Sequence, residues 1–228
     1  MTHSQTVENY LKIIYDLQRA QGKVTTTTLA ERLKVAPASV TGMLKKLAEM
    51  NLVIYEPYQG VYLTAAGEKI ALEVLRHHRL VELYLAEALG VPWDQVHDEA
   101  EKWEHILSER LEARMDAILG HPTTDPHGAP IPTRHGEISP SVKTRLSDLQ
   151  PGQAATIAEV SDHDPALLRY LAGKSLYPKT EVRLLSVALF GDPLTIQVGA
   201  VEYTLGQEVA NHIFVTDITS DPAAAAAN

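Results

Sequence analysis

The residues from 97 to 105, with the sequence HDEAEKWEH, hold the densest set of side chains that could bind a metal. In a helix, four of them share one face, because they lie at offsets of zero, four, seven and eight: His97, Glu101, Glu104 and His105. Carboxylates gathered in this way repel one another and cost several kcal/mol to desolvate unless a cation neutralises them. The pattern indicates a divalent metal site. The alternative is a solvated acidic helix face that carries two ordinary histidines.

Two further segments offer ligands of the same kind. The helix predicted over residues 65–88 carries His78 and Glu82, four positions apart, and the first predicted helix carries Glu8 and Asn9. With several segments contributing, we favour the metal site over the acidic surface. The chain contains no cysteine, which excludes disulfides, thiolate zinc sites, iron–sulfur clusters and cysteine nucleophiles. Any metal must therefore be held by His, Asp, Glu or amide oxygen.

An enzyme built on a dimetal carboxylate centre is the rival class of function. Such helical bundles use a Glu-x-x-His motif on each of two helices. Neither candidate metal helix has this motif, since Glu101 is followed by Glu104 and Glu82 by Leu85. The His-Glu-x-x-His signature of zinc proteases is absent as well. We therefore expect neither an enzyme nor a small-molecule substrate, and a metal-buffering protein is left as a third alternative.

The first 64 residues are predicted to form a winged helix-turn-helix domain. Apolar residues at three- and four-residue steps predict a helix over 6–17. A short helix capped by Thr27 or Thr28 follows, and Pro37 then begins a helix that runs to about residue 50. The next two runs rich in β-branched and aromatic residues predict a hairpin, with strands over 52–55 and 61–64. A hairpin behind a recognition helix is a wing. The alternative is a generic three-helix bundle with a stray hairpin.

Charge is unevenly distributed along the chain. The net charge is −9 overall, but residues 1–63 carry +2, whereas residues 64–120 carry −6 and the remainder −5. The only positive segment is thus the predicted helix-turn-helix, as expected for a module that faces double-stranded DNA, although a solvated surface would also explain so small a charge. The residues expected at the groove are Pro37, Ala38, Ser39, Thr41 and Gly42, with Lys45, Lys46 and the wing residue Tyr58 directed towards phosphates.

Two long helices are predicted after the wing, over residues 65–88 and from Pro92 or Trp93 to Leu119. Paired helices of this kind commonly supply a dimer interface, so we expect a homodimer. Residues 121–140, rich in proline and lacking apolar periodicity, form a connection.

Short strands beyond this connection predict a small β-barrel. The strand candidates are 155–160, 180–187, 194–198, 201–205 and 212–215, with one helix over 167–174. The predicted fold class is therefore α+β. We divide the chain into a winged helix-turn-helix domain (1–64), a helical metal-binding and dimerisation domain with its linker (65–140), an SH3-like barrel (141–219) and a disordered tail (220–228).

Neither a membrane span nor a secretory signal is expected. No run approaches the roughly 18 apolar residues of a membrane helix. The N-terminus has no basic segment followed by an apolar block. We expect a cytoplasmic location and no membrane partner.

Three motifs together resemble the metal-dependent repressors of the diphtheria toxin repressor and manganese transport regulator family. The motifs are Thr6-x-Glu8-x-Tyr10-Leu11-x-x-Ile14-Tyr15, Arg76-x-His78-Arg79-Leu80-x-Glu82 and His97-Asp98-Glu99-Ala100-x-x-Trp103-Glu104-His105. The resemblance covers nearly the whole chain, and its C-terminal segment is similar to the SH3-like FeoA domain of the longer members. It implies a metal-activated, DNA-binding repressor that acts as a homodimer.

The resemblance also implies two metal sites. The primary site consists of Asn9, Glu101, Glu104 and His105, with Glu8 as a further candidate. The second site draws on His78, Glu82, His97, Asp125, His127 and Asp162, of which the last two could instead be a loop residue and a turn former.

Departures from the family pattern bear on the metal. Glu101 stands where iron-sensing members carry Cys and manganese-sensing members Glu, and oxygen ligands suit Mn²⁺. Asn9 replaces an Asp or Met, which should weaken the primary site. Lys12 stands where some manganese regulators carry a second-metal Glu, and Asp125 replaces a Cys found in some relatives. We expect a Mn²⁺-responsive repressor of manganese uptake genes, with Fe²⁺ as the alternative signal and other divalent transition metals binding in vitro.

Overall fold

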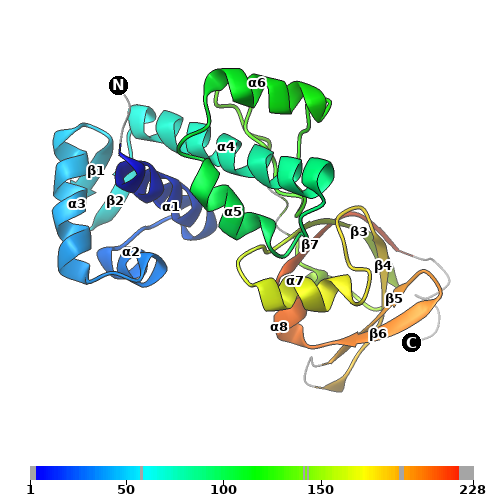
Figure 1. The fold of residues 1–228 in the computed structure, drawn as a ribbon. Coiled ribbons are helices and arrows are strands. Elements are labelled where there is room, and N and C mark those ends of the chain that lie inside the picture. The colour runs from blue at the N-terminus through cyan, green and yellow to red at the C-terminus, as the bar shows by residue number, and fades with distance from the viewer. Residues whose placement is uncertain (1–3, 57–58, 141, 143, 190–192, 221–228) are drawn as a thin grey trace. The chain divides into compact units, whose positions relative to one another are not determined.

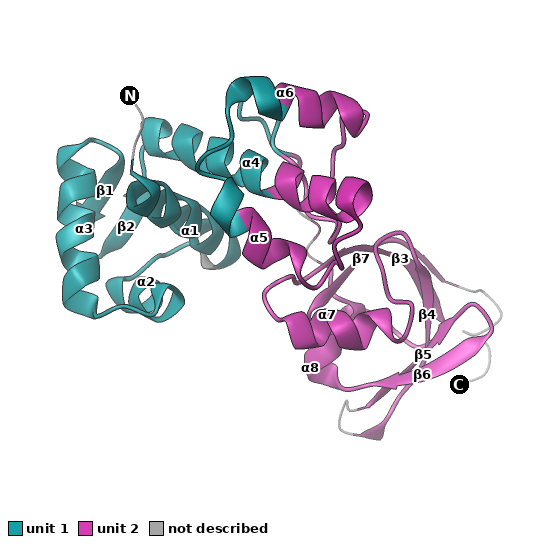
Figure 2. Ribbon diagram, viewed as in Figure 1, with its two compact units in different colours: residues 1–78, 101–112, 132–138 teal, residues 79–100, 113–131, 139–228 magenta. Residues whose placement is uncertain are grey.

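The computed structural model describes residues 4–56, 59–140, 142, 144–189 and 193–220. The chain divides into two compact units, each assembled from three segments (Figure 2). Unit 1 comprises residues 1–78, 101–112 and 132–138, and unit 2 comprises residues 79–100, 113–131 and 139–228. The tail predicted to be disordered, and Tyr58 of the predicted wing, lie outside the described residues.

Unit 1 begins with a three-helix module and a hairpin (Figure 1). Its elements are α1 (Gln5–Gln21), α2 (Thr26–Leu33), α3 (Pro37–Glu49), β1 (Val53–Glu56) and β2 (Gly60–Leu63). Helix α2 is capped by Thr25, whose Oγ1 accepts from the Thr28 backbone N–H at 3.1 Å. This cap lies two or three positions before the predicted one, because Thr25 is the last residue with extended backbone. The predicted Pro37 start of α3 is confirmed.

An apolar core holds this module together. Leu11 and Ile14 of α1 are fully buried with Leu29 of α2 and Leu44 of α3. These residues recur at helical spacing, so each helix turns one apolar stripe inward. The hairpin is antiparallel, with Val53 opposite Leu63. Helix α3 packs one face against this core, and its opposite face is exposed.

Helix α4 (Ala65–Leu89) starts in close contact with the hairpin. Thr64 Oγ1 accepts from the Gly67 backbone N–H at 3.1 Å and caps its first turn. A Cβ at Gly67 would lie 2.0 Å from the carbonyl oxygen of Leu52, so only glycine permits this approach. The start of α4 is thereby fixed against the end of the helix-turn-helix module.

The long helix predicted from residue 92 to 119 is wrong. The structure contains two short helices instead, α5 (Val96–Trp103) and α6 (Glu109–Ile118). The chain turns between them, and Ser108 begins α6: its carbonyl accepts from the Leu111 and Glu112 backbone N–H groups. Serine favours a helix start over a helix interior, which the apolar periodicity concealed. As a consequence, Glu104 and His105 lie in a turn rather than on a helix face.

Unit 2 contains a five-stranded antiparallel sheet with the order β6-β5-β4-β3-β7. The strands are β3 (Gln153–Val160), β4 (Glu181–Val187), β5 (Leu194–Val198), β6 (Val201–Leu205) and β7 (Ile213–Ser220). Three short elements accompany them: η1 (Leu146–Asp148), α7 (Pro165–Ala172) and α8 (Gln207–Ala210). The small all-antiparallel sheet agrees with the predicted barrel. The four-residue α8 and three-residue η1 were not predicted, because they are too short to show periodicity.

Several bounds in unit 2 differ from the predicted ones. Helix α7 begins at Pro165 rather than Leu167, because Asp164 caps it by accepting from the Ala166 backbone N–H at 2.8 Å. Strand β7 runs five residues further than predicted, as its end pairs with the start of β3. Within the described ranges, no helix is both long and apolar enough to cross a membrane.

Candidate metal centres

The candidate ligands form two groups, one within each unit. The first donor group, in unit 1, comprises Glu8, Asn9, His78, Glu101, Glu104 and His105. The second donor group, in unit 2, comprises Glu82, His97, Asp125, His127 and Asp162. Sequence reasoning placed His78 with the second group. In the structure its Nδ1 lies 2.5 Å from Glu104 Oε2 in unit 1, so we describe His78 with the first donor group, and its role in the second metal site stays a prediction.

Helix α1 and the turn after α5 position the first donor group. Glu8 Oε2 lies 2.6 Å from His105 Nδ1. A carboxylate oxygen accepts, so Nδ1 carries the hydrogen, and in the neutral ring the lone pair of His105 is on Nε2. This carboxylate–imidazole pair orients a histidine for metal binding through Nε2. The structure therefore places Glu8 as the residue that orients His105.

Two buried atoms of the first donor group are suited to bind a metal ion. Asn9 Oδ1 and His105 Nε2 are buried, and neither has a hydrogen-bond partner among the described residues. His105 Nε2 lies 3.2 Å from Glu104 Oε1, a separation at which one divalent cation could be coordinated by both atoms. Burying an unsatisfied polar atom costs about 1–3 kcal/mol. The residues present therefore fit a bound divalent cation.

Lys12 lies beside these ligands. Its Nζ donates to Glu101 Oε1 and to both carboxylate oxygens of Glu104, each at 2.7 Å. The Lys12 side chain is 7% exposed and that of Glu104 0% exposed. Burial acts to lower the pKa of Lys12, but the charges of Glu104 and Glu101 outweigh it and raise the pKa. Lys12 is thus a buried ammonium ion within the first donor group.

A second layer of contacts supports the turn that carries Glu104. His77 Nδ1 lies 3.1 Å from the Glu104 carbonyl oxygen, and its Nε2 lies 3.5 Å from Glu112. Arg76 Nε donates to Glu112 Oε1 at 2.6 Å and its Nη1 to the Pro132 carbonyl at 2.8 Å. Hydrogen bonding to His77, followed by the Arg76 charge, lowers the pKa of Glu112 to about 2 despite burial. These contacts hold α4, α6 and the Glu104 turn of unit 1 together.

The connection between α6 and the sheet brings Asp125 and His127 into the second donor group. Asp125 Oδ1 accepts from the backbone N–H groups of His127 and Ala129, at 2.8 and 3.0 Å. Gly128 has φ +91°, and a Cβ there would lie 2.0 Å from the Ala158 carbonyl oxygen of β3. The His127 carbonyl also accepts from the Val160 backbone N–H at 2.9 Å. A tight turn lying on β3 thus fixes both ligands.

His127 presents a lone pair to Glu82. Its Nε2 lies 2.9 Å from the Trp93 carbonyl oxygen, which can only accept, so Nε2 carries a hydrogen, and in the neutral ring the lone pair is on Nδ1. Nδ1 lies 4.0 Å from Glu82 Oε2. In the described part of the chain, neither His127 Nδ1 nor Asp125 Oδ2 has a hydrogen-bond partner, although both atoms are buried. Ligand atoms of Glu82, His127 and Asp162 lie within 4.8 Å of one another, which fits one divalent cation.

Electrostatics in the second donor group reflects buried negative charge. Burial and the Glu82 carboxylate raise the pKa of Asp125 well above its usual value. Burial also acts to raise the pKa of Asp162, but a hydrogen bond to His163 at 2.9 Å and the nearby histidines lower it overall. His97 Nδ1 lies 3.1 Å from Glu82 and 3.9 Å from Asp162. All five sequence-predicted ligands other than His78 therefore gather here.

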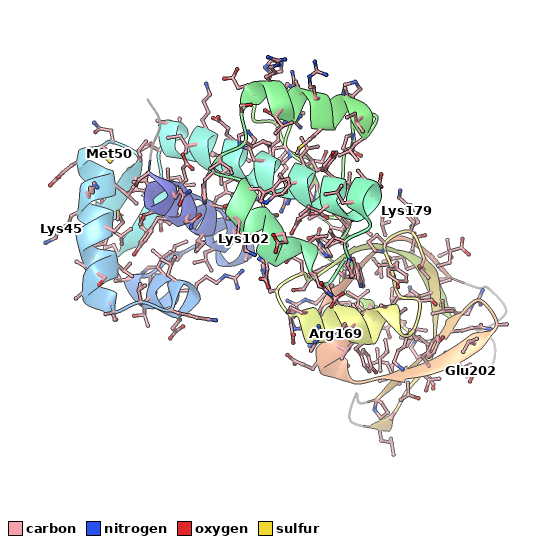
Figure 3. The ribbon with its side chains drawn as sticks, in the orientation of Figure 1. Lys45, Met50, Lys102, Arg169, Lys179 and Glu202 are labelled. Atoms are coloured by element: carbon pink, nitrogen blue, oxygen red, sulfur yellow. The ribbon has the colours of Figure 1, made fainter. Side chains whose placement is uncertain are left out.

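The predicted DNA-contacting residues lie on the exposed side of α3. Pro37, Ala38, Ser39, Gly42, Lys45 and Lys46 are exposed, and Thr41 is half-buried. Figure 3 shows Lys45 on the outer side of the helix. A hollow of about 570 Å³ adjoins this face and is lined by Thr25, Thr26, Thr27, Thr41, Lys45, Tyr55 and Gly60. Of these residues, Thr25, Thr26, Thr27 and Tyr55 were not predicted for this surface. The run of four consecutive threonines was the signal that could have indicated it.

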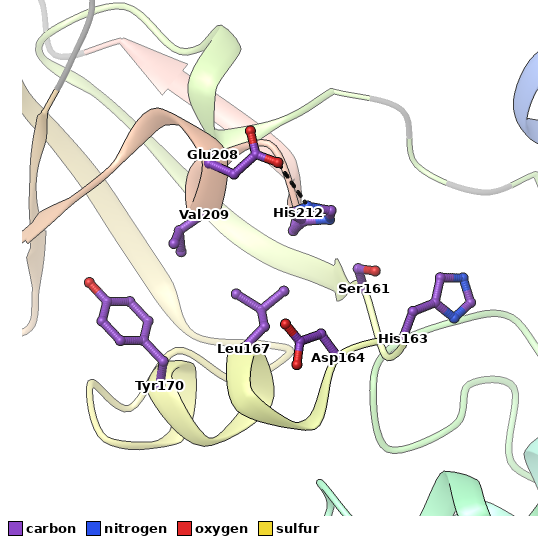
Figure 4. Close-up of a pocket in the computed structure, with 8 residues that line it drawn as sticks. All are labelled: Ser161, His163, Asp164, Leu167, Tyr170, Glu208, Val209 and His212. Carbon is purple, nitrogen blue, oxygen red and sulfur yellow. Dashed lines mark ion pairs between the residues drawn. The ribbon is translucent and has the colours of Figure 1, made fainter.

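A smaller hollow of about 370 Å³ lies in unit 2 (Figure 4). Its lining residues are Ser161, His163, Asp164, Leu167, Tyr170, Glu208, Val209 and His212. Glu208 and His212 form an ion pair at 3.7 Å, and their side chains are 89% and 44% exposed. Because water screens such an exposed pair, this hollow differs from the two buried donor groups.

Comparison with known proteins shows which protein family this chain belongs to. Family models match the chain in three blocks: the N-terminal DNA binding domain of iron dependent repressors over residues 2–61, their metal binding and dimerisation domain over 64–133, and the FeoA domain over 144–217. The chain belongs to the diphtheria toxin repressor family. It is a metal-dependent transcriptional repressor that binds operator DNA and dimerises, and it is not an enzyme.

Relatives of this repressor respond to different metals. The iron-dependent repressor IdeR of Mycobacterium leprae is 30% identical over 93% of this chain and 97% of its own length. A solved manganese-dependent transcriptional repressor in complex with manganese is 38% identical, with a TM-score of 0.86 over 92% of this chain and 99% of that one. The structure of ScaR with bound Cd²⁺ is 32% identical, with a TM-score of 0.79 over 92% and 98% of the two chains.

The identification covers the predicted family and fold. The mixed α+β class, the N-terminal DNA-binding domain, the helical dimerisation domain and the SH3-like FeoA domain are all confirmed. Sequence reasoning missed the supporting residues of this repressor's donor groups. The Trp93 carbonyl, His163 and the set of Arg76, His77 and Glu112 act through spatial contacts that no local spacing reveals.

Proposed function

We propose that this repressor responds to Mn²⁺ and represses genes of manganese uptake, acting on operator DNA in the cytoplasm. The observation that carries the proposal is the chemistry of the two donor groups. Each consists of carboxylate or amide oxygens and imidazole nitrogens, with no sulfur ligand, and each holds buried donor atoms without a hydrogen-bond partner in the described chain. Hard oxygen ligands suit Mn²⁺, while sulfur ligands favour later and softer metals.

The chain's own residues define what metal binding would change. Asn9, Glu101, Glu104 and His105 would hold one ion, and Glu82, Asp125, His127 and Asp162 a second, with His97 and His78 beside them. A bound divalent cation supplies positive charge that neutralises the buried carboxylates. In unit 1, Asn9 lies on α1 and Glu104 in the turn after α5. Ligands on both segments would hold the helix-turn-helix module in one orientation and favour it over others.

Recognition of DNA is proposed for the exposed face of α3. Small side chains at Pro37, Ala38, Ser39 and Gly42 permit close approach to a groove, and a Cβ at Gly42 would meet no atom within 4 Å. Such side chains make few two-pronged base contacts, so specificity would depend in part on DNA shape. Lys45 and Lys46 would contact phosphates.

The test is metal-dependent binding to DNA. The full chain is used to select fragments from its source genome with Mn²⁺ present, and affinity for the selected fragment is measured by fluorescence anisotropy with Mn²⁺, with Fe²⁺ under anaerobic conditions, or with chelator. We expect Mn²⁺ to raise affinity at least about a hundredfold over chelator and to act at a lower free concentration than Fe²⁺. Activation by Fe²⁺ at the lower concentration would instead make this an iron-responsive repressor.

A single substitution ties this response to the first donor group. Glu104→Gln keeps the size of the side chain but removes its charge, so we expect metal-dependent binding to the selected fragment to be lost. Glu109→Gln changes an exposed glutamate at the start of α6 and should behave as the unmodified chain does. Unchanged metal-dependent binding by the Glu104 variant contradicts the proposed ligand role.

A further inference from the structure

The ammonium group of Lys12 lies against the carboxylate oxygens that would bind a metal ion in the first donor group. Both carboxylate oxygens of Glu104 and one of Glu101 accept hydrogen bonds from its ammonium group, at 2.7 Å each. An ammonium group has three donors, and these three contacts use all of them. The oxygens proposed to bind metal therefore already share a positive charge that belongs to the chain.

The position of Lys12 on α1 makes this contact part of the fold. Lys12 follows Asn9 by three residues and Glu8 by four, so one face of the helix presents all three side chains to the turn that carries Glu104 and His105. The Lys12 side chain is 7% exposed, and a lysine that merely solvated the surface would not be buried.

The charges of the group show what the ammonium does. Glu8, Glu101 and Glu104 bring three carboxylates together, and Lys12 supplies one positive charge against them. A divalent cation that binds Glu104 must share its oxygens with this charge or displace it, and either course weakens binding. Asn9 Oδ1 and His105 Nε2, in contrast, receive nothing from Lys12 and have no hydrogen-bond partner in the described structure.

We propose that Lys12 is a built-in cation that competes with the metal at the first donor group and so sets the metal concentration at which this site fills. The inference rests on the proposed function, because it takes the first donor group to be a metal site. In the absence of metal, Lys12 keeps α1 attached to the Glu104 turn. In the second donor group, which lies in unit 2, the neighbouring cation is Arg79, whose Nε lies 3.7 Å from Asp125 Oδ2 and so does not make the 2.7 Å contacts that Lys12 makes with Glu104.

The experiment isolates the first donor group and counts bound Mn²⁺. An Asp125→Asn background weakens the second group, and free Mn²⁺ is followed by its electron paramagnetic resonance signal during titration of the full chain at constant pH. In this background, Lys12→Met removes the ammonium and keeps the length of the side chain. We expect the Mn²⁺ dissociation constant to fall at least about tenfold. Lys69→Met, an exposed lysine on α4, is the matched control and should leave it unchanged.

Two more variants keep the result decisive. Lys12→Gln removes the charge but leaves a hydrogen-bond donor, so it serves if the Met variant does not fold, and it should also bind Mn²⁺ more tightly. Lys12→Arg retains the charge and should stay close to the unmodified affinity. Equal or weaker Mn²⁺ binding by both uncharged variants, or no Mn²⁺ binding by any variant, overturns the proposal.

The same variants separate this inference from the proposed function. Thermal unfolding without metal should occur at a lower temperature in Lys12→Met, and the rise on adding Mn²⁺ should be larger than in the unmodified chain. If the unmodified chain binds DNA without regard to Mn²⁺ while the uncharged variants still bind Mn²⁺ more tightly, the proposed function fails and the role of Lys12 stands.

Discussion

At the scale of single residues, the site depends on which nitrogen of each histidine carries the hydrogen. Glu8 fixes the hydrogen of His105 on Nδ1, and the Trp93 carbonyl fixes that of His127 on Nε2. Each ring thus directs its lone pair at a carboxylate, at 3.2 and 4.0 Å. A metal ion bound as we propose would find both histidines already oriented, which would reduce the entropy cost of binding.

Asp125→Asn should separate metal binding from stability. Burial and Glu82 raise the pKa of Asp125, so its charged form is disfavoured in the fold and a neutral amide relieves that cost. The amide still accepts from the His127 and Ala129 backbone N–H groups. We expect the metal-free variant to unfold at an equal or higher temperature, and to bind one Mn²⁺ fewer per chain by elemental analysis after gel filtration. A lower unfolding temperature with full Mn²⁺ content would contradict both expectations.

Glu112 provides a test of pH dependence. Its pKa in the fold is about 2, below the usual value of 4.5, so its ion pairs stabilise the fold fully above pH 4.5 and lose this contribution as pH falls towards 2. Glu112→Gln removes the carboxylate charge that lies against the buried Arg76 guanidinium and should cost about 3 kcal/mol near pH 6. Urea unfolding of both chains from pH 6 to pH 3 should show this difference shrinking as pH falls. A difference that stays constant with pH would mean that the Glu112 charge is not involved.

At the scale of elements, the sequence predicted the helices whose apolar residues recur at regular spacing. It missed a helix boundary that one residue determines. The helical stripes of α1, α3 and α4 follow from apolar spacing, and Pro37 marks the start of α3. The break between α5 and α6 depends on Ser108, a capping residue inside an otherwise periodic run. Candidate ligands were found because carboxylates and histidines cluster in the sequence. The contact between His78 and Glu104 was not predicted, since it depends on where the turn at Glu104 lies.

The turn at Gly128 shows how an element holds a site, and it can be tested by adding one methyl group. Gly128→Ala places a Cβ 2.0 Å from the Ala158 carbonyl oxygen at a positive φ, so the turn must move away from β3. We expect a loss of about 2–4 kcal/mol in unfolding free energy and weakened Mn²⁺ binding by the second donor group. Gly199→Ala is the control, because its φ is also positive but a Cβ there meets no atom within 4 Å. It should lose about 1 kcal/mol and bind Mn²⁺ normally.

At the scale of the whole molecule, the DNA-binding module has a positive net charge and the remainder of the chain a negative one. The net charge is −9, yet the N-terminal 63 residues are positive, and Lys45 and Lys46 lie exposed on α3. An acidic body disfavours non-specific attachment to DNA, so binding must come from the helix-turn-helix module in its held orientation. In a dimer each phosphate contact is made twice, once by each module. A weakly basic module is therefore sufficient for binding to DNA.

The dependence of operator affinity on salt concentration should show how many phosphate contacts these lysines make. Each phosphate neutralised contributes about 0.9 to the slope of log affinity against log salt concentration. Replacing Lys45 and Lys46 by Ala removes four charges from a dimer, so the slope should fall by up to about 3.6, whereas a single bound chain would lose up to about 1.8. The slope is measured by anisotropy titrations of the Mn²⁺-selected fragment at salt concentrations from about 50 to about 300 mM. Lys69→Ala is the control. An unchanged slope in the double variant would place the phosphate contacts elsewhere on the module.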